Sequence, residues 1–254
     1  MPMNKKWFLL LLLVFCRCTN DMSIVENEDN FTISHSTCFP TVSDKYVYSI
    51  VPGMVEWQQL NSTDDAYQLC QLPDDVLKSI STSGLIDALI HAPLFTGFSL
   101  LSGSASALKW HAHYDRFNSA KELFERKDAG NSLVAYHKLV CFDCFVDTPE
   151  GYREYERMNG LEILFTRQEI LDQMGHEKKK EAVASLLSNY EQHDFRHSLV
   201  SVAHIMLADK YAPIVKYSLD NTEEFLCTLE GYDYSSNPNQ WNIIISYAKN
   251  FIND

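Results

Sequence analysis

The chain has 254 residues, of which 46% are hydrophobic, and its 21 basic and 34 acidic side chains give a net charge of −13. This hydrophobic content is ordinary for a globular protein and predicts a buried core. The negative charge argues against a nucleic-acid partner, because neutralising phosphates requires a basic surface. It also argues against electrostatic docking on anionic lipid.

The N-terminus is typical of an export signal. Lys5 and Lys6 precede an unbroken apolar run from Trp7 to Phe15. Signal peptides have apolar regions of about 7–15 residues, whereas a membrane-spanning helix needs about 20. We therefore expect residues 1–17 to be a signal peptide and the mature chain to be located in the periplasm or at the cell surface. Cleavage removes three basic residues and no acid, so the net charge becomes −16.

Two cysteines at the end of the apolar run suggest lipoprotein processing, in which the thiol is acylated and becomes the first residue. Cys16 follows Phe15 and Cys18 follows Arg17, although such sites favour a small residue before the cysteine. We favour Cys18, because a polar stretch begins there. Lipidation at Cys18 is the first expectation, and simple secretion is the alternative.

The rest of the chain divides into a tether and a domain. Residues 18–44 are mostly polar and predict a flexible tether. Residues 45–254 are expected to form a single helical domain, and an internal boundary, if there is one, falls near residues 145–150. Alternating Tyr and Val residues before Pro52-Gly53 predict a short extended piece and a turn.

Helical patterns begin at about Thr63 and continue to the C-terminus. Boundary signals come from prolines, capping residues and a glycine: Pro73 and Ser81 as starts, Pro93 as a stop, Asp128 as a cap, Thr166–Glu169 as a capping box and Gly175 as a C-terminal stop. Apolar residues then recur at helical spacing in three sets, at 183–190, 199–206 and 241–248.

Short amphipathic helices joined by brief loops must each bury an apolar stripe against a neighbour. The expected fold class is therefore all-α, either an irregular multi-helix bundle or a short α-solenoid-like helix-pair array, with a small extended N-terminal segment. The sequence has no clean repeat period, which favours the bundle.

Five cysteines follow the leader, so at least one is a thiol or pairs between chains. Cys141 and Cys144 form a C-x-x-C pair. A redox pair requires a helix N-terminus after a strand, and a zinc site requires a second pair of ligands. The surrounding sequence offers neither, so we expect a local disulfide between Cys141 and Cys144, or two buried thiols.

His111 and His113 lie in an H-x-H-x-D segment that resembles part of the zinc motif of metallo-β-lactamases. The next histidine of that motif is replaced by Arg116, and residues 108–117 predict a helix. Positions i and i+2 of a helix do not share a face. We therefore expect two partly exposed polar positions and no metal site.

His193 and His197 are four residues apart, but they precede the apolar stripe that begins at Leu199 and are expected in the connecting loop. Asp194 replaces the glutamate of the H-E-x-x-H protease signature. The nucleophile elbow, the phosphate loop and the dinucleotide fingerprint are also absent from the sequence. We accordingly assign no catalytic, cofactor-binding or metal-binding residue.

Several short sequence motifs between residues 45 and 140 are similar to those of a set of uncharacterised exported proteins from gut bacteria. They are YSIVPGMVEW at 48–57, LPDDVLKSIST at 72–82, PL at 93–94, FN at 117–118, EL at 122–123 and RKDA at 126–129. The resemblance implies an exported helical fold. The resemblance does not indicate an activity, because these motifs fall on helix starts, caps and core positions.

The sequence favours an exported, envelope-associated binding module over an enzyme. Its expected partner is an unknown protein or peptide, because grooves between helix pairs accept such segments. No cofactor is expected, and membrane contact is expected only through the N-terminal lipid. The alternative function is a hydrolase with a site built across helices, drawing on His111, His113 and nearby acids. A third is a purely structural envelope protein.

Overall fold

The computed structural model describes residues 38–96, 107–141, 149–193, 196–222, 225 and 238–254. Within these ranges all regular secondary structure is helical, and the all-α prediction is confirmed. The expected signal peptide, Cys18 and most of the expected boundary at 145–150 lie outside the described residues. A search of the described helices finds no candidate membrane span.

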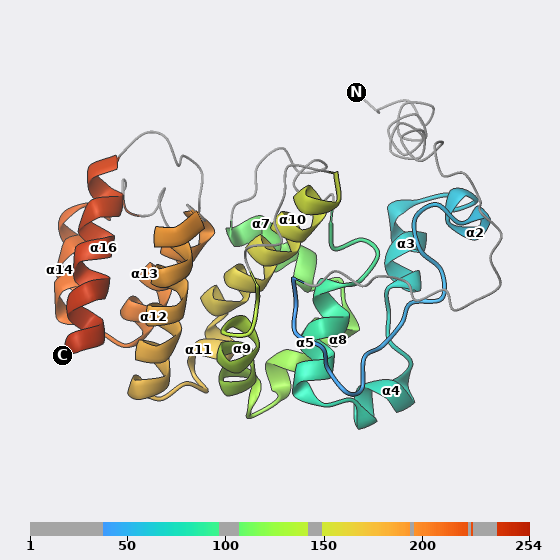
Figure 1. The fold of residues 1–254 in the computed structure, drawn as a ribbon, viewed down its shortest axis with the longest axis horizontal. Coiled ribbons are helices and arrows are strands. Elements are labelled where there is room, and N and C mark those ends of the chain that lie inside the picture. Colours follow the sequence, from blue (N-terminus) through green and yellow to red (C-terminus); the bar gives the residue numbers. More distant parts are fainter. Residues whose placement is uncertain (1–37, 97–106, 142–148, 194–195, 223–224, 226–237) are drawn as a thin grey trace.

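The helices follow one another through short connections (Figure 1). Their bounds are α2 Val55–Gln58, α3 Thr63–Leu69, α4 Asp74–Ser79, α5 Thr82–Ile90, α7 Ala107–Tyr114, α8 Asn118–Glu125, α9 Ala129–His137, α10 Pro149–Ile163, η3 Leu164–Thr166, α11 Gln168–Leu171, α12 His176–His193, α13 Arg196–Ala208, α14 Ala212–Asp220 and α16 Pro238–Asn253.

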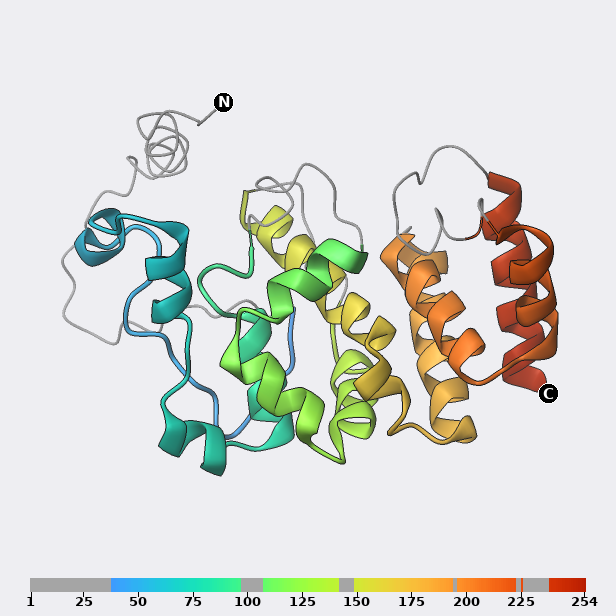
Figure 2. The same cartoon turned by 180° about the vertical axis from the view of Figure 1, so that it is seen from behind.

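The helices lie side by side in a row along the longest axis of the molecule, from α2 and α3 at one end to α14 and α16 at the other (Figure 1). Helix α5 packs on α8 and α9, α9 packs on α12, and α12 packs on α13 and α16. Helix α10 joins the earlier helices of the row to the later ones, because it contacts α5 and α7 and also α13. Seen from behind, α7 and α8 (green) and α13 (orange) lie toward the viewer (Figure 2). The row is closer to a helix-pair array than to a closed bundle.

Among the predicted boundary signals, Ser81 and Pro73 act as expected, whereas Thr166 and Gly175 act differently. Helix α5 begins after Ser81, whose hydroxyl accepts the Gly84 N–H at 3.0 Å, and α4 begins directly after Pro73. The Thr166 hydroxyl, however, donates to the Ile163 carbonyl at 2.8 Å and leaves α11 without a side-chain cap.

Gly175 also differs from its prediction. Its carbonyl accepts the Lys179 N–H at 3.0 Å, so Gly175 precedes the first turn of α12. The residue therefore marks the start of one helix and not the end of the helix before it.

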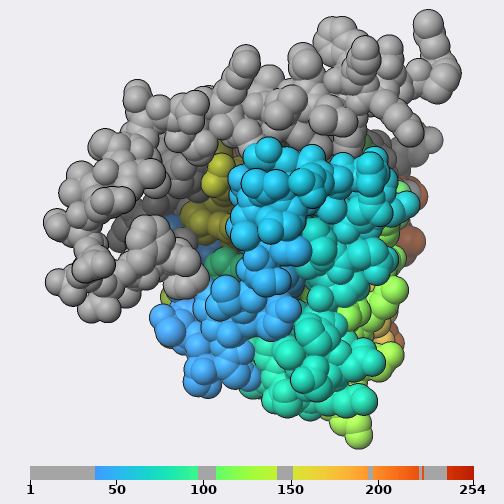
Figure 3. All heavy atoms as spheres, turned by 90° about the vertical axis from the view of Figure 1, so that its right-hand side faces the viewer, coloured from blue at the N-terminus to red at the C-terminus, as the bar shows by residue number. Residues whose placement is uncertain are grey.

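The N-terminal segment packs on the domain earlier than expected. Cys38 and Phe39 are only 3% and 7% exposed. The Asp44 carboxylate accepts hydrogen bonds from both the backbone N–H and the hydroxyl of Ser81. The predicted tether, which runs to residue 44, therefore overlaps the packed domain. Figure 3 views the end of the molecule that this segment (blue) forms together with α2–α4.

Candidate functional site

The two histidines of the H-x-H segment lie on α7 and point to different neighbours. The Nε2 of His111 lies 2.7 Å from the Thr166 hydroxyl, and the Nδ1 of His113 lies 2.7 Å from the Tyr67 hydroxyl. Burial lowers the pKa of His111 to about 4 and that of His113 to about 3. His113 is 3% exposed, so the expectation of a partly exposed residue is wrong for this position. These two histidines do not form one site.

The second histidine pair lies within two helices, so the expectation that both residues belong to the connecting loop is wrong. His193 is the last residue of α12, and His197 is buried in the first turn of α13. Across the described ranges, no group of three His, Cys, Asp or Glu side chains is arranged to hold a metal ion.

The cysteines are arranged differently from the predicted local pair. Cys141 is exposed and carries a thiol, so it does not form the predicted disulfide with Cys144, which lies outside the described residues. Cys38 is disulfide-bonded. The Cys141 N–H donates to the Cys38 carbonyl at 2.8 Å, which ties the N-terminal segment to the residues that follow α9.

A different polar cluster forms around the fully buried carboxylate of Glu162 on α10. Its Oε1 accepts from the Asn189 amide and lies 3.3 Å from the Nε2 of His137, and its Oε2 accepts from the Ser198 hydroxyl at 2.8 Å. A buried carboxylate is costly unless donors surround it. Here the three partners come from α9, α12 and α13, so the cluster joins four helices.

The other ring nitrogen of His137 faces Ser185. Nδ1 lies 2.7 Å from the Ser185 hydroxyl. Both oxygens of Glu162 act as acceptors, from the Asn189 amide and the Ser198 hydroxyl, so we assign the proton of the facing His137 nitrogen to Nε2. The lone pair is then on Nδ1, and the Ser185 hydroxyl donates to it.

These three side chains form a serine–histidine–carboxylate chain with hydrogen-bond distances of 2.7 and 3.3 Å. Such a chain allows the imidazole to remove a proton from the serine. The ring nitrogens have exchanged roles relative to the usual triad, in which Nε2 faces the serine.

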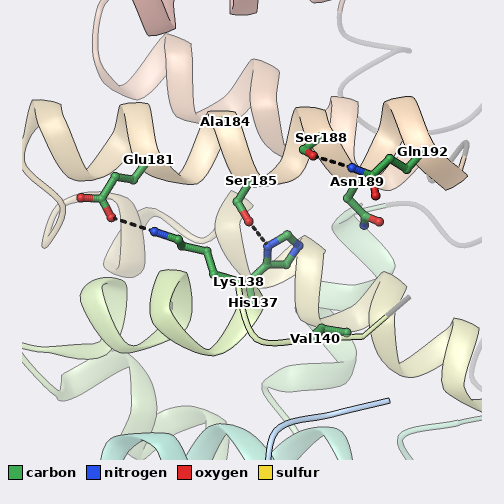
Figure 4. Close-up of a pocket in the computed structure, with 9 residues that line it drawn as sticks. All are labelled: His137, Lys138, Val140, Glu181, Ala184, Ser185, Ser188, Asn189 and Gln192. Atoms are coloured by element: carbon green, nitrogen blue, oxygen red, sulfur yellow. Dashed lines mark hydrogen bonds and ion pairs between the residues drawn. The ribbon is translucent and has the colours of Figure 1, made fainter. Parts of the chain in front are cut away.

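The serine–histidine–carboxylate chain ends in a pocket between α9 and α12 with a volume of about 380 Å³. Ligand sites in proteins commonly have volumes of about 300–1,000 Å³. Figure 4 shows Ser185 and His137 meeting at this pocket, with Lys138 and Glu181 beside them. The lining residues are His137, Lys138, Val140, Glu181, Ala184, Ser185, Ser188, Asn189 and Gln192.

The pocket carries adjacent opposite charges. The Lys138 ammonium lies 3.9 Å from the Glu181 carboxylate, and both side chains are about half exposed. A hydrogen bond from Lys178 at 2.8 Å holds the pKa of Glu181 below its usual range. Farther along α12, the Gln192 amide donates to the Ser188 hydroxyl at 3.0 Å.

None of the residues in the serine–histidine–carboxylate chain was assigned to a site from the sequence. His137 falls within an apolar helical pattern, and 25 and 48 residues separate it from Glu162 and Ser185. One local signal was available: Glu162 stands between Leu161 and Ile163, which are both fully buried. A carboxylate on an apolar face must have donors, and their identity depends on tertiary packing.

Comparisons with family models, with curated proteins and with solved structures give no match for this chain.

Proposed function

We propose that the protein is an exported, envelope-associated binding module and that the pocket between α9 and α12 binds a short peptide or a peptide end. The leader, the tether and the resemblance to exported proteins support export. Attachment to the envelope rests on the acylation expected at Cys18.

One observation carries the binding proposal. The pocket places a cation and an anion side by side, Lys138 and Glu181, next to the hydroxyls of Ser185 and Ser188. A peptide end offers opposite charges and backbone hydrogen-bonding groups, which match this lining. The floor of the pocket is held by the Glu162 cluster, so little ordering cost is expected on binding.

An array of short peptides that differ in terminal and side-chain charge, probed with the purified mature domain, tests this function. We expect a charge-dependent set of bound peptides. Reversing one charge with Glu181→Lys should remove or invert that preference, because charge complementarity governs partner choice. The matched control is Lys216→Glu, which reverses an exposed charge on α14 outside the pocket. Binding that is equally altered by both variants, or no binding at all, contradicts the proposal.

The second candidate is the hydrolase. His111 and His113 do not support it, because the structure directs them to Thr166 and Tyr67. The observation that favours it is the hydrogen-bonded chain from Ser185 through His137 to Glu162.

A further inference from the structure

We propose that Ser185 is a nucleophile activated by His137 and Glu162, and that the α9–α12 pocket hydrolyses small carboxylic esters. The proposal uses the same pocket as the proposed binding function, but it does not require a peptide to bind there.

Burial decreases from Glu162 through His137 to Ser185, as a nucleophile that must reach a substrate requires. Glu162 is fully buried, His137 is 1% exposed, and Ser185 is partly exposed in the wall of the pocket. The carboxylate and the imidazole are thus shielded from water, while the hydroxyl is open to a small molecule. A structural hydrogen bond alone would not require its outer member to face a cavity.

The cluster also fixes the direction of proton transfer. The Asn189 amide and the Ser198 hydroxyl hold the Glu162 carboxylate in place, and the carboxylate holds the His137 proton on Nε2. Nδ1 is then the base that faces Ser185 at 2.7 Å. When Nδ1 gains a proton, the imidazolium lies against a buried anion, which stabilises it.

The reaction has two balanced steps, with water as the co-reactant. The Ser185 oxygen attacks the ester carbonyl carbon and passes its proton to Nδ1 of His137. The ester C–O bond breaks, and the leaving alkoxide takes that proton to become an alcohol. Water then attacks the acyl-serine while His137 accepts its proton. The acid leaves as the proton returns to Ser185.

The location of Ser185 limits the substrate class. It lies inside α12, where backbone N–H groups are bonded within the helix and do not form an oxyanion hole. The donors left in the pocket are side chains such as Lys138 and Gln192. This weaker stabilisation suits esters with good leaving groups and not amides. A volume of about 380 Å³ limits the acyl group to a small one.

Diisopropyl fluorophosphate and 4-nitrophenyl acetate, applied to the purified mature protein, test the proposal. We expect one phosphoryl adduct per chain, mapped to Ser185 by peptide mass spectrometry, together with ester turnover. Ser185→Ala and His137→Gln should each lower the labelling rate and the turnover by about 100-fold or more, the usual contribution of an activated base. The matched control is Ser218→Ala, a serine of α14 that does not line the pocket, which should stay within about twofold of wild type.

Circular dichroism melting of each variant separates lost chemistry from lost folding. Absence of an adduct on the wild-type protein overturns the proposal, whatever the variants do. So does an adduct that persists in Ser185→Ala. Labelling without binding on the peptide array would support the nucleophile and reject the binding function, and the reverse result would reject the nucleophile alone.

Discussion

At the scale of single residues, Gly160 shows how closely the core is packed. An added Cβ atom there would lie 2.4 Å from Cζ of Phe95 and 2.9 Å from Cζ3 of Trp110. Both aromatic side chains are almost completely buried. The carbonyl of Gly160 also accepts the Tyr114 hydroxyl at 2.5 Å. The absent side chain therefore lets α10 approach the aromatic residues that α7 and the segment after α5 supply.

We expect Gly160→Ala to lower the free energy of unfolding by about 1–3 kcal/mol, because overpacking displaces buried rings. The higher helix propensity of alanine offsets about 1 kcal/mol at most. Urea unfolding followed by circular dichroism measures the change. Arg153→Ala, at an exposed position of the same helix, is the control and should change stability by no more than about 0.5 kcal/mol. Equal effects of the two substitutions would contradict the close packing at Gly160.

At the scale of elements, α7 carries two histidines, His111 and His113, whose packing in the fold lowers their pKa values. Burial sets the pKa of His111 at about 4 and that of His113 at about 3, and the Arg116 guanidinium adds to the effect on His113. An ordinary histidine has a pKa of about 6.5. Below that pH the unfolded chain binds protons that the folded chain does not bind, so stability falls as the pH falls.

The stability contributed by the neutral histidines should be complete above about pH 6.5 and decline as the pH falls, down to about 4 for His111 and about 3 for His113. Each histidine contributes a slope of at most about 1.4 kcal/mol per pH unit. Urea unfolding at pH 7, 6 and 5 measures this slope, and His113→Gln should flatten it. The control Lys121→Gln changes an exposed residue of α8 that stays charged over this range. A slope that His113→Gln leaves unchanged would show that His113 does not remain neutral in the fold.

The same helix shows which elements could be predicted from sequence. The i, i+2 spacing of His111 and His113 correctly predicted divergent side chains, because helix geometry alone decides it. Ser81 correctly predicted the start of α5, since its cap bond is local. Thr166 failed as a cap because its hydroxyl has nearer partners in Ile163 and His111, the second of which is a tertiary contact. The Ser81 hydroxyl also has a distant partner, Asp44, but it donates to that carboxylate and its oxygen still accepts the Gly84 N–H. Local signals were therefore reliable where a tertiary contact left the capping oxygen available as an acceptor.

At the scale of the whole molecule, the candidate site could not be predicted from the sequence. It draws on four helices, and its three central residues His137, Glu162 and Ser185 share no motif or spacing. Which carboxylate meets which histidine is decided by the packing of α9 on α12 and of α10 on α13. The fold class was predictable because apolar periodicity recurs in several helices, whereas the site depends on one particular arrangement of the helices.

The acidity of the whole chain bears on the attachment to the envelope that we propose. A net charge of −16 after cleavage gives no attraction to anionic lipid, so an acyl chain would have to supply the attachment. Buried acyl chains contribute about 0.8 kcal/mol per CH₂ group. We therefore expect the mature protein to stay in the membrane fraction after a wash in about 1 M salt, where the Debye length is about 3 Å. Mass spectrometry should find an N-terminal peptide that begins at an acylated Cys18.

The variant Cys18→Ser should release the protein into the soluble fraction, whereas Cys16→Ser should leave it bound, because only the cysteine at the mature N-terminus is acylated. An unmodified N-terminus located beyond Cys18 would exclude lipidation and leave simple secretion. Retention of Cys18→Ser in the membrane fraction would require another mode of attachment, and the negative charge of the domain makes an electrostatic one unfavourable.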